Sequence, residues 1–118
     1  MIQQLEISAV HFKLDEDLKK YGNKKIGQLD RYVPRNARAS VHAEVKLKEA
    51  KANHKDRFNC EVILHLPHKT IAISETAINM YAAIDIVETK LRYQLAKYKD
   101  LHGNPKLYRR VIHRLNKS

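Results

Sequence analysis

The sequence predicts an α+β fold, a two-layer sandwich in which two helices cover one face of a four-stranded sheet. Two patterns along its 118 residues predict this fold. Four segments alternate apolar and polar residues, as strands with one buried face do, and two longer segments repeat apolar residues every three or four positions, as amphipathic helices do. Their order is strand, helix, strand, strand, strand, helix, which implies an antiparallel meander plus one crossover. This length favours a single domain.

The first strand and the first helix are predicted near the N-terminus. Residues 3–12 alternate apolar and polar side chains and therefore predict a strand. Asp15 is suited to cap the helix that follows. The apolar stripe of this helix is ended by Pro34, and Gly22 and Gly27 weaken the helix locally.

Three strands are predicted in the middle of the chain. Residues 41–48 and 58–66 alternate like the first strand, and the polar segment 49–57 between them predicts a hairpin loop. Pro67 ends the third strand because proline cannot donate to a sheet ladder. Residues 70–74 predict a short fourth strand, and the remainder up to residue 78 is expected to lead into the next helix.

Residues 79–99 predict a long amphipathic helix, with Asn79 as its cap. Its apolar residues recur at spacings of three and four and form one stripe that must face a core. This stripe contains Met80, Ile84, Val87, Leu91, Leu95 and Tyr98.

Polar residues occupy both flanks of this stripe. At about 100° per residue, Lys90, Tyr93 and Lys97 fall together on one flank, which we interpret as an exposed basic edge without compensating acidic charge. On the other flank, Arg92 is expected to pair with an acidic residue one or two turns before it, either Glu88 or Asp85.

The composition restricts the classes of partner. Lys and Arg number 23 against 13 Asp and Glu, a formal net charge of +10, which favours RNA, DNA or an anionic membrane as partner. No apolar run is long enough to cross a membrane and the N-terminus lacks the pattern of a signal peptide, so a cytoplasmic location is expected. One cysteine, Cys60, excludes an internal disulfide and predicts a small buried residue.

No catalytic constellation can be assembled from the sequence. An enzyme needs a nucleophile with a base, a metal set or a phosphate-binding loop, and none of the three glycines lies in a glycine-rich motif. His65 and His68 come closest to a metal pair, but in a strand they would point to opposite faces. No catalytic activity, metal, cofactor or small-molecule substrate is therefore expected.

The basic edge of the long helix predicts RNA binding. Lys90 and Lys97 are spaced so that each can neutralise a phosphate and release its counterions. Tyr93 between them is able to stack on an unpaired base, an interaction of about 1 to 3 kcal/mol in single-strand binders. The alternative is that all three residues form a merely solvated face of a basic protein.

The same helix carries a resemblance to a known family. The run of residues 80–85 resembles the last helix of the bacterial ribosome hibernation factors, the group of short ribosome-associated inhibitors and hibernation-promoting factors. The resemblance extends more weakly over about the first 100 residues. It also includes Lys90-Leu91, Gln94-Leu95, Lys25-Ile26, Leu29-Asp30-Arg31-Tyr32 and Leu66-Pro67-His68-Lys69.

This resemblance implies a function and a set of contacts. Family members bind the small ribosomal subunit in the decoding channel, where messenger and transfer RNA would otherwise sit, and keep idle ribosomes inactive by occupying it. Their channel-facing cations match Lys25, Lys90 and Lys97, whereas Gln28 and Tyr93 stand where the family has cations. The resemblance also implies a fold similar to the double-stranded RNA-binding fold with an added first strand.

From the resemblance we expect a short-form member whose residues 1–102 form the ribosome-binding domain. Its expected partner is the small ribosomal subunit with its ribosomal RNA, with no membrane partner, and the chain is expected to be a monomer off the ribosome. The expected RNA-binding residues are Lys20, Lys24, Lys25, Gln28, Lys90, Tyr93, Gln94, Lys97, Arg109, Arg110 and Arg114.

Residues 103–118 are expected to form a basic C-terminal tail. Asn104-Pro105 provides a cap and a first-turn proline for a second helix, which is amphipathic but too short to be stable by itself. A membrane-surface helix shows the same pattern, although this apolar side is narrow and lacks Trp and Phe. We therefore expect the tail to order against ribosomal RNA or its own domain, and its basic charge favours the kind of factor that promotes ribosome dimerisation.

Two alternatives remain open. One is a free-standing protein that recognises duplex RNA by its shape, which long double-stranded RNA would compete away from the ribosome. The other is an interaction module that uses its sheet face or its tail to hold a protein partner, for which salt-insensitive ribosome binding would be evidence.

Overall fold

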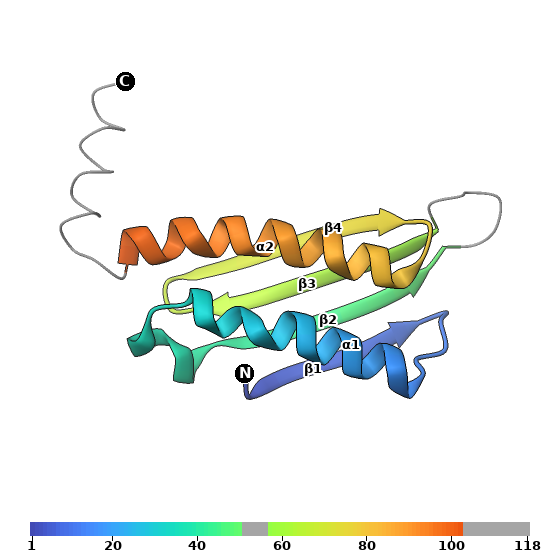
Figure 1. Ribbon diagram of the computed structural model, residues 1–118, viewed down its shortest axis with the longest axis horizontal. Helices are drawn as coiled ribbons and strands as arrows, with labels where there is room; N and C mark the ends of the chain where they lie inside the picture. The colour runs from blue at the N-terminus through green and yellow to red at the C-terminus, as the bar shows by residue number, and fades with distance from the viewer. Residues whose placement is uncertain (51–56, 103–118) are drawn as a thin grey trace, which may run out of the picture.

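The computed structural model describes residues 1–50 and 57–102, which form one sheet covered on one face by two helices (Figure 1). The strands, which are adjacent in this order, are β1 (Gln4–Val10), β2 (His42–Glu49), β3 (Phe58–Leu66) and β4 (Lys69–Ala77). The helices are α1 (Glu16–Gly27) and α2 (Met80–His102), with the short 3-10 helices η1 (Gln28–Tyr32) and η2 (Arg35–Ser40) between α1 and β2. The predicted α+β fold is confirmed.

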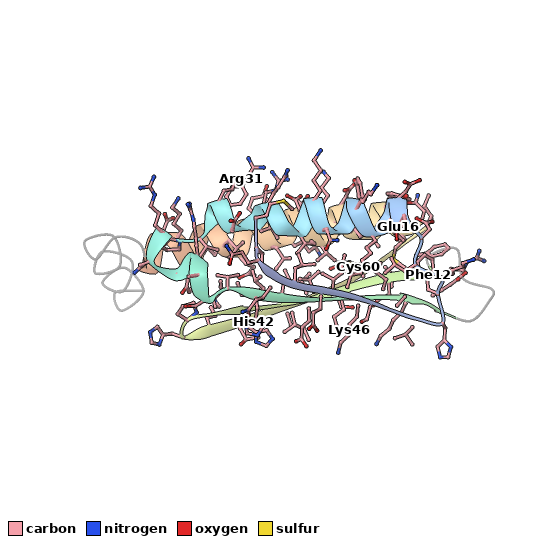
Figure 2. All side chains as sticks on the ribbon, turned by 90° about the horizontal axis from the view of Figure 1, so that it is seen from below. Phe12, Glu16, Arg31, His42, Lys46 and Cys60 are labelled. Atoms are coloured by element: carbon pink, nitrogen blue, oxygen red, sulfur yellow. The ribbon has the colours of Figure 1, made fainter. Side chains whose placement is uncertain are left out.

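The strand directions follow from the connections. β1 is parallel to β2 because the chain crosses back over the sheet through α1, whereas β2, β3 and β4 are antiparallel neighbours. The helix α1 contacts β1, and α2 contacts β3 and β4. Figure 2 shows both layers edge on: Arg31 points away from the sheet on the helix side, Cys60 lies between the layers, and His42 and Lys46 extend from the uncovered face.

The core lies between the inner face of the sheet and the apolar stripe of α2. All six residues predicted for this stripe are buried, from Met80 near its start to Tyr98 near its end. The Tyr98 hydroxyl donates to the carbonyl oxygen of Pro67 at 2.8 Å, so its polar atom is satisfied inside the core. Cys60 is fully buried as predicted, and burial raises the pKa of its thiol to about 12.

The first helix is shorter than predicted. Asp15 caps it, with its side chain accepting from the Leu18 N–H at 2.7 Å, but the α-helix ends at Gly27 rather than near Pro34. A Cβ added at Gly27 would meet only Cε of Met1 at 2.7 Å, the end of an exposed and flexible side chain. Leu29 remains buried because η1 continues the path with tighter turns.

The segment between η1 and β2 was not assigned from the sequence, and the structure shows that Arg38 organises it. The Arg38 Nε donates to the carbonyl oxygens of Asp30 and Val33, both at 3.1 Å. The Asp30 carbonyl also accepts the Val33 N–H at 3.0 Å, so Arg38 adds a side-chain donor to a turn that already has its backbone bond. Arg38 of η2 is thus bonded to the end of η1 and to Val33. These contacts do not appear as apolar periodicity in the sequence.

The fourth strand is longer than predicted. β4 runs over Lys69–Ala77 and pairs with β3 along its whole length, so the expectation that residues 75–78 form a lead into the helix was wrong. Glu75 lies on the inner side of the strand, in phase with Ile71 and Ile73. A charged residue at an inner position interrupts the apolar alternation by which a strand is recognised in a sequence.

Asn79 caps α2 as predicted: its Oδ1 accepts from the Ala82 N–H at 2.8 Å, and the first turn of α2 contains no acidic residue. We predict that Asn79→Ala lowers the free energy of unfolding by about 1 kcal/mol because this bond is lost. Asn79→Asp should raise it by about 0.3 to 1 kcal/mol at low salt because a negative charge favours the helix N-terminus. Urea denaturation of the three proteins tests this, and a destabilising Asn79→Asp would contradict it.

Candidate nucleic-acid interface

The helix layer presents the predicted cations on its outer side. Lys20 and Lys24 of α1 are exposed, as are Lys90 and Lys97 of α2. Tyr93, on the same helix, has 71% of its surface exposed, more than the other large hydrophobic residues of the helix layer. The structure therefore leaves most of the predicted binding residues accessible to a partner.

Lys25 of α1 is not a free cation, because it contacts Asp85 of α2. Its Nζ lies 3.7 Å from the Asp85 Oδ1 and 5.7 Å from the centre of the Tyr21 ring. The Tyr21 hydroxyl donates to the same carboxylate oxygen. The hydrogen bond to Asp85, together with burial and nearby negative charge, raises the pKa of Tyr21 to about 12.

Lys90 is also paired, which corrects the prediction of an uncompensated basic edge. Its Nζ contacts the Oε1 of Glu75, the inner-facing residue of β4. The sequence placed this carboxylate in a connecting segment, so its contact with α2 was missed. Lys97 forms no ion pair with any residue of the described ranges 1–50 and 57–102, and it is the least neutralised of the three cations.

The helix α2 separates Lys25 from Lys90. Asp85, which holds Lys25, and Lys90 are five residues apart and therefore lie about 140° apart around the helix. Lys25 occupies the flank of α2 that faces α1, and Lys90 occupies the flank that faces β4. Lys25 and Lys90 therefore lie on opposite flanks of α2.

The remaining predicted residues differ in their contacts. Arg92 pairs with Glu88 at 3.0 Å, which confirms one of its two expected partners. Gln28 accepts a hydrogen bond from Arg31 at 3.2 Å, and Gln94 is half-buried in a groove beside β4. The three tail cations predicted to bind RNA lie outside the described residues; they are Arg109, Arg110 and Arg114.

A pocket that the sequence did not predict opens between η1 and α2. It encloses about 260 Å³. It is lined by Tyr32, Thr89, Arg92, Tyr93 and Ala96. Tyr32 belongs to a segment far from Tyr93 in the sequence, so no spacing rule joins the two rings, and only the packing of η1 against α2 brings them together.

The uncovered face of the sheet has a different character. The His42 and His65 rings stack with their centres 4.2 Å apart, and the His65 Nε2 lies 3.0 Å from a carboxylate oxygen of Glu44. The hydrogen bond to His65 lowers the pKa of Glu44. These residues line a shallow hollow of about 650 Å³ that also contains Glu6, which adjoins Glu44 across the β1–β2 pair.

Two further findings concern the described part of the chain. No three His, Cys, Asp or Glu side chains among residues 1–50 and 57–102 are placed to hold a metal ion. Within the same ranges, the helices are too short or too polar to span a membrane.

A family profile described as Sigma 54 modulation protein / S30EA ribosomal protein matches residues 5–102. This chain belongs to that family. The family members it resembles include the ribosome hibernation promotion factor of Lactococcus lactis subsp. cremoris, 29% identical over 96 residues, and that of Staphylococcus aureus, 30% identical over 96 residues. The resemblance to ribosome hibernation factors is thereby confirmed. In each case the alignment covers 81% of this chain. It covers 49% of the Lactococcus protein and 48% of the Staphylococcus protein, so this chain spans about half the length of either relative.

Solved structures share the fold. The N-terminal domain of Protein Y from Thermus thermophilus is 26% identical, with a TM-score of 0.66 over 82% of this chain and 97% of that one. A ribosomal subunit interface protein from Coxiella burnetii is 22% identical, with a TM-score of 0.65 over 82% and 98% of the two chains, and shows the fold alone. These structures do not confirm the expected similarity to the double-stranded RNA-binding fold.

We predict that Tyr21→Phe lowers the free energy of unfolding by about 1 kcal/mol at neutral pH, because it removes the hydrogen bond to Asp85. The folded-state pKa of Tyr21 lies above its unfolded value near 10, so this contribution is complete below pH 10 and disappears as pH rises towards 12. Urea denaturation of both proteins at several pH values tests this. A difference that grows above pH 10 would contradict it.

Proposed function

We propose that this protein is a ribosome hibernation factor that binds the small ribosomal subunit through its helix layer and occupies the decoding channel, excluding messenger and transfer RNA. The observation that carries the proposal is the set of exposed cations on both flanks of α2, on a chain with a formal net charge of +10. The family of the chain and the names of its relatives support a ribosomal partner.

The ion pairs of Lys25 and Lys90 are compatible with this role because they are weak. The Lys25 side chain is 40% exposed and that of Lys90 is 52% exposed. Exposed pairs of this kind contribute about 0 to 1 kcal/mol. A phosphate group, which brings its own charge and releases counterions, can replace either carboxylate at little cost. In the free protein the carboxylates of Asp85 and Glu75 position the two lysines, and RNA phosphates replace these carboxylates on binding.

The distribution of acidic residues sets the orientation on RNA. Glu6 and Glu44 adjoin each other on the uncovered face of the sheet and would repel phosphates there. The helix layer presents Lys20, Lys24 and Lys97 as exposed cations. In this proposal RNA contacts the helices, and the hollow with the two glutamates points away from it.

Inhibition in this proposal arises from occupancy alone, without catalytic turnover and in the cytoplasm. Residues 1–102 supply the ribosome-binding domain, and the basic tail of residues 103–118 adds phosphate contacts and favours ribosome dimerisation. Off the ribosome the protein is a monomer.

Sedimentation with purified small subunits tests the proposal. We predict that the protein sediments with empty subunits and is displaced when messenger and transfer RNA are bound first, because they fill the same channel. Displacement by long double-stranded RNA, with no effect of messenger RNA, would instead identify a duplex-binding protein. Ribosome binding that does not respond to salt would identify a protein-interaction module.

We predict that the logarithm of the affinity falls with the logarithm of salt concentration by roughly 0.7 to 0.9 per phosphate neutralised. The double variant Lys90→Ala and Lys97→Ala should reduce this slope by about one to two units and leave the melting temperature nearly unchanged, because both side chains are exposed. Glu75→Gln should act in the opposite direction, since it releases Lys90 for RNA.

The matched control removes the same charge from the other face. Lys46→Ala and Lys48→Ala change two lysines of β2, of which Lys46 extends from the uncovered face (Figure 2). This pair should leave the salt slope within about half a unit of the original. Equal effects of the two double variants would show that overall charge, and not the helix layer, determines binding.

A further inference from the structure

The pocket between η1 and α2 has the size of a single planar ring system. It encloses about 260 Å³, below the roughly 300 to 1,000 Å³ that is typical of sites for drug-sized ligands. Its walls are mainly apolar, and the side chains that line it come from both elements. A ligand that enters it therefore has to be small and flat, or a small part of a larger molecule.

Aromatic and cationic groups surround this pocket. Tyr93 leaves 71% of its surface in water, so its ring adds little to the core. Tyr32 is half-buried, and the Arg31 guanidinium lies 5.6 Å from the centre of its ring. Exposed aromatic rings beside guanidinium groups are typical of proteins that stack on the bases of single-stranded nucleic acids.

Neighbouring side chains hold the Arg92 guanidinium at the pocket wall. Its Nε pairs with Glu88 at 3.0 Å and its Nη2 donates to the Thr89 hydroxyl at 3.4 Å. The Thr89 hydroxyl in turn donates to the carbonyl oxygen of Asp85 at 2.9 Å. Because these bonds exist before any ligand arrives, little side-chain freedom is lost on binding.

We propose that this pocket receives one unpaired nucleobase of single-stranded RNA, stacked on Tyr93, with the phosphate next to it near Arg31. The inference deepens the proposed function and rests on it, since the bound ribosomal RNA supplies the base. Charge complementarity favours this occupant: the lining contains no carboxylate, and Arg31, which lies beside the Tyr32 ring, is bonded to the neutral Gln28 amide. The larger hollow on the sheet face contains two glutamates and would repel the same nucleotide.

Short RNA probes test the pocket directly. Affinity is measured for oligo-uridylate and for an oligonucleotide of equal length without bases, each with the original protein and with Tyr93→Ala. We expect Tyr93→Ala to weaken binding of oligo-uridylate roughly 5- to 150-fold, the equivalent of one lost base stack. The same substitution should not change binding of the abasic probe, because no base is present to stack. The salt slope should stay the same, since tyrosine neutralises no phosphate.

Three further variants control the experiment. Tyr93→Phe keeps the ring and should retain most of the affinity. Ala96→Leu fills the pocket while keeping Tyr93, and it should weaken oligo-uridylate binding as Tyr93→Ala does. Tyr81→Ala removes another exposed ring of α2 that does not line the pocket, so it should leave binding unchanged. Melting temperatures establish that each variant is folded.

The results separate this inference from the proposed function. If Tyr93→Ala weakens both probes equally or neither, or if the original protein does not bind oligo-uridylate, the pocket is not a base site. Salt-dependent binding to small subunits would then still support the proposed function. If the original protein binds oligo-uridylate with the expected dependence on Tyr93 but does not bind small subunits, the base site stands and the ribosomal function is wrong.

Discussion

The packing of α2 on β3 and β4 is the constraint on which the rest of the molecule depends. Its stripe is buried from Met80 to Tyr98, and the Tyr98 hydroxyl is bonded to Pro67 at the β3–β4 turn. Because a helix has one rotation about its axis once its apolar stripe is buried, the positions of all its polar residues follow. Because this stripe is buried, Tyr93 lies on the exposed side of α2, and Lys90 lies on the flank that faces β4.

Carboxylates from other elements set the state of the lysines beside α2. Glu75 reaches Lys90 from the inner side of β4, and Asp85 holds Lys25 with the help of Tyr21. Both pairs are partly exposed, so they position the cations without making them unavailable to phosphate. The affinity of such a surface for RNA does not depend on the number of lysines alone. It depends on how much more strongly each lysine interacts with an RNA phosphate than with the protein carboxylate that it leaves.

The two faces of the molecule have distinct chemistry. The helix face combines exposed lysines with the aromatic pocket at Tyr32 and Tyr93, whereas the sheet face carries stacked histidines beside two adjacent glutamates. A two-layer fold produces this asymmetry because only one face of the sheet is covered. The outward residues of the helices and those of the strands therefore form two separate surfaces, which can differ in charge and in aromatic content.

The sequence by itself determined the fold class, the caps at Asp15 and Asn79, the buried stripe of α2 and the exposed position of Tyr93, because each follows from local periodicity or from a bond between near neighbours. It also carried the family resemblance. The exact length of β4 did not follow from local periodicity, because Glu75 interrupts the apolar alternation at an inner position, where it pairs with Lys90.

Tertiary structure alone decided the ion pair of Lys25, the role of Arg38 in the segment before β2, and the meeting of Tyr32 with Tyr93. These contacts join residues on different elements, and their partners are selected by how the elements pack. Periodicity reports which side of an element is buried, but it contains no information on which element lies opposite.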